Sequence, residues 1–129
     1  MKPPVWVARE TVLAVHEQLL AEFGGSSGLR DEGLLHSALG RPENLFGNGE
    51  PDLFDLVASY GFGLVKNHAF VDGNKRTGFA VAVLFLQLNG VHLEATETDA
   101  TVQTLALAAG AIKESTYAAW LRKTSKRRR

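Results

Sequence analysis

The chain has 129 residues, of which 45% are hydrophobic and 22% are charged, proportions that suit one globular domain with a core. It has no cysteine, which excludes a disulfide scaffold and a thiolate zinc site. The formal net charge is zero, yet residues 1–121 carry 8 basic and 14 acidic groups, a net charge of −6, because six basic residues fall within 122–129. We interpret 1–121 as a single domain and 122–129 as a solvated basic tail without a role in nucleic-acid binding.

Neither a secretion signal nor a membrane span is predicted. The first residues, Met1 to Pro4, are not followed by an apolar run of the kind found in signal peptides. The longest apolar stretch, Phe79 to Leu86, is far shorter than the ~20 residues that cross a bilayer. A chain without cysteine also suits a reducing compartment, so we expect a cytoplasmic protein that does not contact membranes.

The first 50 residues predict two helices and a loop. Apolar residues at helical spacing indicate a helix over 11–23, which ends at a glycine pair beginning with Gly24. Asp31 is typical of an N-cap, and the helix after it is expected to end before Pro42, because proline disfavours the helical conformation in the residue before it. The asparagines and glycines of 43–50 predict a flexible loop.

The next two predicted helices are more apolar. The third covers 52–65 and contains Gly61 and Gly63, which weaken a helix by up to ~1 kcal/mol each and indicate that a neighbouring helix approaches closely. The fourth covers 75–89 and is apolar on nearly every face over 78–86, which is typical of a buried helix. We therefore place the fourth helix at the centre of the fold.

The remaining residues complete an all-helical pattern. Thr96 opens a fifth helix with the spacing of a capping box, and Gly110 ends it. Ser115 is expected to cap a sixth helix, and only 91–93 alternates with the period of a β-strand. The predicted fold class is all-α, with about six helices wrapped around a central buried helix.

One segment ahead of the fourth helix concentrates reactive side chains, and it reads His68-Ala69-Phe70-Val71-Asp72-Gly73-Asn74-Lys75-Arg76. The turn-forming Asp72 and Gly73 leave the free N–H groups of the next helix, and the positive end of its dipole, facing a ligand, an arrangement that binds phosphate. Gly73 also lets a ligand approach the backbone closely. Lys75 and Arg76 add positive charge at the same point.

The same segment offers groups for chemistry on a phosphate. His68 can accept a proton from an alcohol near neutral pH, and Asp72 can hold a magnesium ion that bridges phosphates. Asn74 can cap the helix or contact an oxygen, and Phe70 and Val71 are expected to anchor the loop in the core. A base, a metal ligand and a cationic phosphate site together indicate phosphoryl or nucleotidyl transfer.

The segment His68 to Arg76 closely resembles the signature of the Doc toxins, the death-on-curing branch of the Fic/Doc family. The likeness extends to Gly28-Leu29-Arg30-Asp31 and on to Leu35, to Ala38 through Pro42, and to Leu84-Phe85-Leu86 with Asn89-Gly90. The resemblance implies an all-helical fold. It also implies site roles: general base for His68, magnesium ligand and catalytic residue for Asp72, phosphate binding for Gly73, Asn74 and Lys75, and both catalysis and phosphate binding for Arg76.

Doc toxins are known as kinases, so the resemblance implies a toxin that uses ATP and Mg²⁺ to phosphorylate a threonine of elongation factor Tu and thereby arrests translation. It also implies a partner, a small Phd-like antitoxin whose C-terminal segment folds onto the toxin. Apolar residues in the predicted loop over 43–50, such as Leu45 and Phe46, are candidates for that contact.

Three alternatives remain open. An AMP transferase of the Fic type is less favoured, because Fic enzymes carry glycine at the position of Lys75 and a second arginine, a bidentate phosphate clamp, at that of Phe79. An all-helical ribonuclease rests on the spacing of Arg30 and His36, which arises easily by chance. A protein that only binds its antitoxin would need neither a base nor a metal ligand.

Other residues of interest are expected to be structural. His16 lies near the apolar stripe of the first helix, and Trp6 and Trp120 are predicted to pack in the core. Arg30 and Arg41 can reach a phosphate or a partner, but the sequence does not place them. No two histidines have the spacing of a zinc site.

Overall fold

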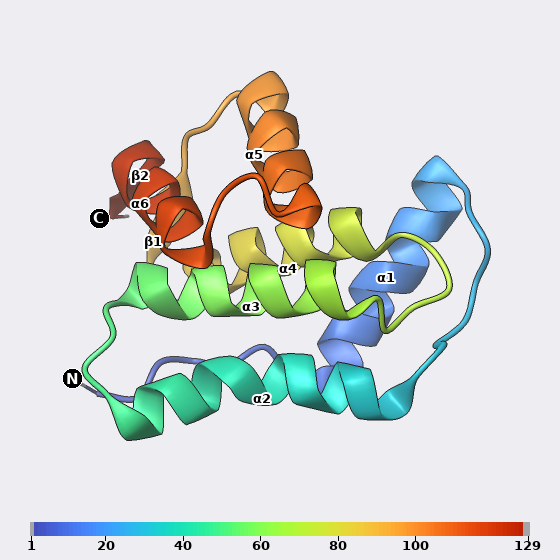
Figure 1. Cartoon of the computed structure of the whole chain (residues 1–129), viewed down its shortest axis with the longest axis horizontal. Helices are drawn as coiled ribbons and strands as arrows, with labels where there is room; N and C mark the ends of the chain where they lie inside the picture. The colour runs from blue at the N-terminus through green and yellow to red at the C-terminus, as the bar shows by residue number, and fades with distance from the viewer. Residues whose placement is uncertain (1, 128–129) are drawn as a thin grey trace.

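The computed structural model describes residues 2–127, and the six helices within them confirm the predicted all-α class (Figure 1). The helices are α1 (Arg9–Phe23), α2 (Glu32–Asn48), α3 (Leu53–Asn67), α4 (Asn74–Leu88), α5 (Glu97–Ala109) and α6 (Glu114–Thr124). Two short strands, β1 (Val91–Leu93) and β2 (Ser125–Arg127), pair in an antiparallel sheet. No helix within 2–127 is long and apolar enough to cross a membrane.

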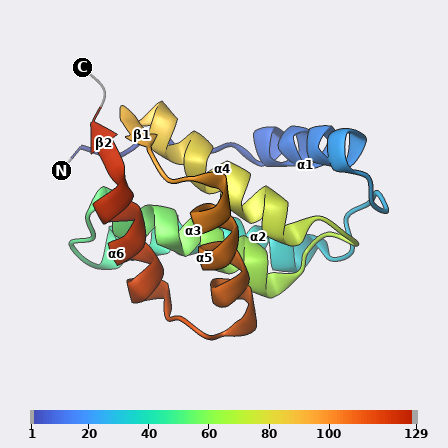
Figure 2. The same ribbon diagram turned by 90° about the horizontal axis from the view of Figure 1, so that it is seen from above.

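The central helix is α3. It packs against α2, α4, α5 and α6, and nine of its 15 residues are buried, compared with seven of 15 in α4. Figure 1 shows α3 between α2 and α4, and Figure 2 shows α5 and α6 crossing it. The placement of the fourth helix at the centre is therefore wrong. Phe79 and Leu84 on α4 stay partly exposed, because apolar composition does not decide whether another element covers each face of a helix.

Glycines let neighbouring helices cross α3 at short distances. A Cβ atom on Gly63 would lie 3.2 Å from a backbone atom of α2, and one on Gly61 would lie 3.0 Å from the ring of Tyr117 in α6. From the opposite side, a Cβ atom on Gly78 of α4 would lie 2.7 Å from Val65 of α3. The predicted close approach at Gly61 and Gly63 is confirmed.

Helix α2 continues through the region that was expected to be a loop. Pro42 lies inside the helix, which ends at Asn48, so the predicted end before Pro42 and the predicted loop over 43–50 are both wrong. Pro42 is buried, and the ring of Phe46 packs edge-on against Trp6 with centroids 5.8 Å apart. This apolar packing outweighs the ~3 kcal/mol that a proline costs inside a helix.

Side-chain caps begin several helices. Asp31 accepts a hydrogen bond of 2.9 Å from an N–H of the first turn of α2, and Thr96 accepts one of 3.1 Å from the first turn of α5, as predicted. The prediction for Ser115 is wrong, because α6 already begins at Glu114, and Lys113, two residues before Ser115, occupies the cap position without a side-chain hydrogen bond.

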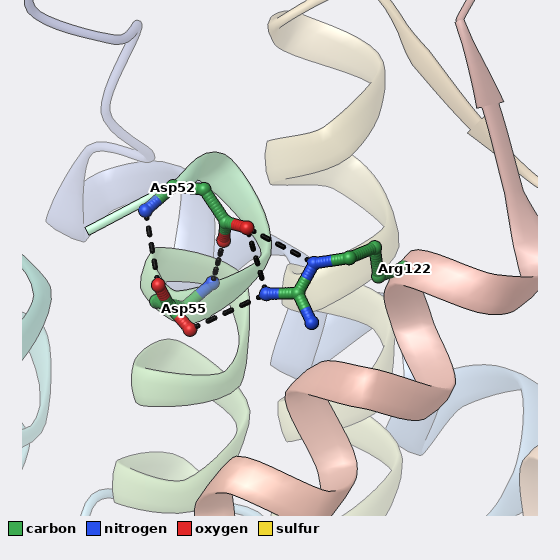
Figure 3. A network of polar contacts seen from close by, with 3 residues as sticks. All are labelled: Asp52, Asp55 and Arg122. Carbon is green, nitrogen blue, oxygen red and sulfur yellow. Dashed lines mark hydrogen bonds and ion pairs between the residues drawn. The ribbon is translucent and has the colours of Figure 1, made fainter.

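Asp52 caps α3 and joins it to α6 (Figure 3). Its carboxylate accepts hydrogen bonds from the N–H of Asp55 at 2.9 Å and from the Arg122 guanidinium at 2.7 and 3.0 Å. Burial alone would raise the pKa of Asp52, but these bonds outweigh burial and hold the pKa below its ordinary 3.8. The carboxylate therefore stabilises the fold above pH 3.8, and this contribution is lost as the pH falls through the lowered pKa.

The basic C-terminal residues belong in part to the folded domain. Arg122 and Lys123 lie in the last turn of α6, and 125–127 form β2, so the folded region continues past the boundary predicted at residue 121. The strand forms because β1, which lies more than 30 residues earlier, offers backbone partners that a run of charges does not reveal. The end of the predicted tail, 128–129, lies outside the described residues.

The N-terminal segment is fastened across the bundle. The side chain of Asn89, just after α4, accepts a hydrogen bond from the N–H of Val5 at 2.8 Å and donates one to its carbonyl at 3.0 Å. The ring of Trp6 packs against those of Tyr60 and Phe85, with centroids 6.4 and 6.0 Å away. The predicted packing role of Trp6 is confirmed.

Candidate active site at the start of α4

The segment from His68 to Arg76 connects the end of α3 to the first turn of α4. His68 ends α3 in the left-handed conformation, with φ of 52° and ψ of 49°, and is exposed. This conformation is uncommon for a residue with a Cβ atom and needs support. Arg30 supplies it, because its guanidinium donates to the carbonyl of His68 at 2.8 Å and to that of Asn67 at 3.3 Å. These bonds fix the backbone that carries His68.

A segment between α1 and α2 runs beside the same loop. The N–H of Arg30 donates to the carbonyl of Ala69 at 2.7 Å, and the N–H of Val71 donates to the carbonyl of Gly28 at 3.0 Å. Leu29 thereby forms an isolated antiparallel bridge with the loop. On this side the loop is therefore held in an extended conformation by backbone pairing with the segment around Leu29.

Phe70 and Asn74 anchor the loop in the core. They are 2% and 6% exposed, and the Asn74 side chain both donates to the carbonyl of Phe70 and accepts from its N–H, each at 3.0 Å. The anchoring role of Phe70 is confirmed, whereas Val71 is 53% exposed and does not anchor the loop. The side chain of Asn74 braces the loop and does not cap α4. Its phosphate contact stays a prediction, for its backbone N–H.

The Asp72 carboxylate is exposed and held by two backbone donors. One oxygen accepts from the N–H of Gly73 at 2.9 Å, and the other from the N–H of Ser26 at 3.3 Å. Within residues 2–127 no three acidic, histidine or cysteine side chains gather into a metal site. A single carboxylate fits magnesium nonetheless, since this ion usually takes its other ligands from nucleotide phosphates and water. The metal role of Asp72 stays a prediction.

The N-terminus of α4 opens beside this carboxylate. Gly73 precedes the helix with φ of 79°, a left-handed conformation that glycine adopts without strain. The N–H of Thr77 donates to the carbonyl of Gly73 at 3.0 Å, which is the first bond of the helix ladder. The N–H groups of residues 74–76 precede that bond and are available to an anion, which the helix dipole also attracts.

The cations near the loop have different surroundings. Lys75 and Arg76 are exposed in the first turn of α4, and the Arg76 guanidinium lies 4.5 Å from the centre of the Phe23 ring at the end of α1. Lys66 donates instead to the carbonyl of Ala108 at 3.2 Å. Lys66 therefore stabilises the C-terminus of α5, and the positive charge beside the N-terminus of α4 comes from the other two residues.

Comparison with known proteins identifies the family to which the chain belongs. The sequence model of the Fic/DOC family matches residues 6–86, which include the whole loop. The chain belongs to the Fic/DOC family. It is 48% identical over 75 residues to "Toxin Doc" of Mycolicibacterium smegmatis, a match that spans 57% of this chain and 58% of that toxin. It is 33% identical over 118 residues to "Protein kinase doc" of Escherichia phage P1, which spans 91% and 93% of the two chains.

Two positions distinguish this Fic/DOC protein from the AMP-transferring pattern. Lys75 is exposed in the first turn of α4, so a side chain projects where glycine would leave only backbone. Phe79, one turn further along the helix, is partly buried and has no hydrogen-bond donor. The guanidinium groups described at this Fic/DOC loop are therefore that of Arg76, in the first turn of α4, and that of Arg30, which lies in the neighbouring segment and is engaged with the end of α3.

Several residues considered for binding act within the fold of the Fic/DOC domain. Arg30 binds the carbonyls at the end of α3, whereas His36 on α2 lines a depression beside Trp6, so the spacing predicted for a ribonuclease does not form one site. Arg41 forms an ion pair of 2.8 Å with Glu114 and thereby joins α2 to α6. Both arginines are thus engaged within the fold and not at the N-terminus of α4.

The apolar residues expected to contact an antitoxin lie in a helix. Phe46 packs against the core, and Leu45 is 37% exposed. Leu45 lines an open depression of about 570 Å³ together with Pro51 and Ala58, bordered by the start of α6. Of the two candidates, Leu45 alone keeps the exposure that a partner surface needs.

Two residues that hold the site in place could not be identified from the sequence. Ser26 and Arg30 bind the loop from 46 and 38 residues away along the chain. No local spacing connects residues so far apart. The family resemblance around 28–31 was the available signal, and it does not say which atoms are bound.

Proposed function

We propose that this Fic/DOC protein is a Doc-type toxin that acts as a protein kinase in the cytoplasm and transfers the γ-phosphoryl group of ATP to a threonine of elongation factor Tu. The observation that carries the proposal is the 33% identity, over nearly the full length of both chains, to a protein named as a protein kinase. The site supports it, since an exposed histidine, an exposed carboxylate and a cationic helix N-terminus converge on one loop.

In the proposed mechanism His68 accepts the proton of the threonine hydroxyl as the oxygen attacks the γ-phosphorus. The N–H groups at the start of α4, with Lys75 and Arg76, bind the phosphate oxygens and stabilise the charge that moves toward ADP. Asp72 would hold Mg²⁺, which when bound neutralises phosphate charge. The bond between the γ-phosphorus and the bridging oxygen breaks, and ADP leaves.

Lys75 and Phe79 favour transfer of the γ-phosphate of the nucleotide over transfer from its α-phosphate. The lysine side chain occupies space that a deeply bound nucleotide needs for its α-phosphate to face His68. Phe79 supplies no second clamp for a deeper polyphosphate. The γ-phosphate is then the group presented to the base, which favours a kinase over an AMP transferase.

The deciding experiment incubates the protein with elongation factor Tu and ATP that is labelled separately at the α and γ positions. Only γ label, with a mass gain of one phosphate on a threonine, is expected on the target. Transfer of α label would replace the kinase assignment with AMP transfer. The His68→Ala protein is the control for labelling that does not depend on the site.

The proposal includes a Phd-like antitoxin as the inhibitory partner. A disordered segment of such a protein would fold as a helix against exposed apolar surface, and the depression beside Leu45 is a candidate for part of that surface. Co-expression of a Phd-like antitoxin should restore growth, and Leu45→Glu should weaken that rescue. Equal rescue of both proteins would exclude the Leu45 surface, and no rescue of either would exclude that partner.

A further inference from the structure

His16 is a buried polar residue beneath the loop, and the mechanism above does not use it. It lies on α1 and is 2% exposed. Its Nε2 atom is 2.8 Å from the backbone carbonyl oxygen of Asp72. Its ring stacks on that of Phe70, with centroids 3.8 Å apart and planes 13° from parallel. A residue 56 positions earlier in the chain thus contacts both the anchor of the loop and the backbone of the proposed metal ligand.

The hydrogen bond has one possible direction. A carbonyl oxygen can only accept, so Nε2 of His16 must carry the hydrogen and donate it. The peptide between Asp72 and Gly73 is planar and trans, so its N–H points away from its carbonyl. That N–H donates to the Asp72 carboxylate at 2.9 Å. One peptide plane therefore links His16 on its inner side to the carboxylate on its outer side.

This plane depends on an external support. Gly73 adopts φ of 79°, and glycine reaches positive and negative φ with similar ease, so the intrinsic cost of turning the peptide over is small. Turned over, the peptide would present its carbonyl to the carboxylate and lose the hydrogen bond. The donor on His16 opposes that rotation, because the carbonyl that faces His16 would lose its partner.

We infer that His16 is a positioning residue, which holds the Asp72–Gly73 peptide and through it directs the Asp72 carboxylate toward a divalent cation carried by the nucleotide. The inference rests on the proposed function for its consequence in catalysis. The structural part, that the donor on His16 sets the peptide plane, stands on the contacts alone. A residue that merely filled the core would act through its ring and not through its donor.

Two substitutions separate the donor from the ring. His16→Gln places an amide N–H near the position of Nε2 and removes the aromatic ring, whereas His16→Phe keeps a ring against Phe70 and removes the donor. Val12→Ala is the matched control, since Val12 lies one turn earlier on the same buried face of α1 and is 0% exposed. This control variant measures the effect of lost packing in α1 alone.

The first readout needs neither nucleotide nor metal. In ¹⁵N-labelled protein the amide of Gly73 should be protected from hydrogen exchange in the wild type and in His16→Gln. In His16→Phe this amide should exchange faster and its resonance should shift. In Val12→Ala its exchange rate and its resonance should stay as in the wild type. A Gly73 amide that is unchanged in a folded His16→Phe protein would overturn the inference. So would an Nε2 atom without a hydrogen on His16 of the wild type, a measurement that does not depend on how the variants fold.

The second readout is the Mg²⁺ concentration that half-saturates nucleotide binding and phosphoryl transfer. Groups that orient a metal ligand typically contribute 10–100-fold in affinity, so His16→Phe should raise this concentration by ~10-fold or more, and His16→Gln should restore most of it. Equal loss in both variants would mean a packing role and overturn the inference. Failure of the wild type to transfer phosphate would refute the proposed function, and the amide measurement would still decide the role of His16.

Discussion

At the scale of single residues, the reactive groups of the loop are exposed and their supports are buried. His68 and Asp72 face solvent, whereas Phe70 and Asn74 beneath them are 2% and 6% exposed. An exposed side chain away from caps and ion pairs adds little to stability, while a buried hydrogen-bonded one adds much. Substitution of an exposed group should therefore change activity, whereas substitution of a buried support should change the free energy of unfolding.

Replacing His68 by alanine should abolish activity and leave the fold intact. A general base typically contributes ~10²–10⁴-fold, so phosphorylation of elongation factor Tu should fall by that factor and expression should no longer stop bacterial growth. The thermal unfolding midpoint should stay close to that of the wild type. His36→Ala, an exposed histidine on α2, is the control and should remain fully toxic. Undiminished toxicity of His68→Ala would remove this residue from the mechanism.

Replacing Asn74 by alanine should destabilise the protein. The change leaves the N–H and the carbonyl of the buried Phe70 without their 3.0 Å partners, which costs ~1–3 kcal/mol for each group that finds no water. Chemical denaturation would measure the loss. Lys75→Ala changes the exposed neighbour and should alter the free energy of unfolding by less than ~0.5 kcal/mol. Equal stability of the two variants would show that the side chain of Asn74 is not a brace.

At the scale of helices, the position of the loop depends on how closely α3 and α4 pack. The loop joins the end of one helix to the start of the other, so a change in their separation changes the distance between His68 and the N-terminus of α4. One point of close approach is Gly78 of α4, where an added Cβ atom would lie 2.7 Å from Val65 of α3. A β-branched valine is stiff in a helix and cannot move aside cheaply.

Two glycine substitutions should have opposite effects. Gly78→Ala places a Cβ atom 2.7 Å from Val65, and such overpacking should destabilise by ~1–3 kcal/mol in spite of better helix propensity. A Cβ atom on Gly47 in α2 meets nothing within 4 Å, so Gly47→Ala should stabilise by ~0.4–1 kcal/mol. Unfolding by urea measures both. A stabilised Gly78→Ala protein would contradict the close packing of α3 and α4.

At the scale of the whole molecule, two tyrosines connect the core to its surroundings. Tyr60 of α3 accepts a hydrogen bond of 3.2 Å from the N–H of Val7 in the N-terminal segment. Tyr117 of α6 packs against Gly61. Burial raises the pKa of each to about 12, and the charge of Glu43 adds to the effect at Tyr60.

These raised pKa values predict how stability changes in alkali. Because the folded-state pKa lies above the ordinary 10.0, both tyrosines favour the folded state fully below pH 10, and this contribution is lost as the pH rises from 10 toward 12. The free energy of unfolding should fall over that interval. The chain has two tyrosines, so phenolate absorbance should rise together with the loss of helix. Absorbance that rises near pH 10 in a still-helical protein would refute the burial of both rings.

The sequence by itself determined the features that depend on neighbouring residues. Helix class, the caps at Asp31 and Thr96, and the existence of a reactive loop ahead of a helix all follow from side chains within a few positions of one another. The motif from His68 to Arg76 also carried the family, because its residue types and spacing are specific. Local propensity and a short signature are sufficient for such features.

Only the tertiary structure decided the features that depend on distant partners. Helix α2 continues past Pro42 because its residues pack on Trp6 and the core. Part of the basic tail forms a strand because it pairs with β1. The inward direction of Asn74 and the contact of His16 with the loop likewise involve atoms that only folding brings together. Apolar composition named the wrong central helix, because burial depends on which faces of a helix its neighbours cover and not on its own side chains alone.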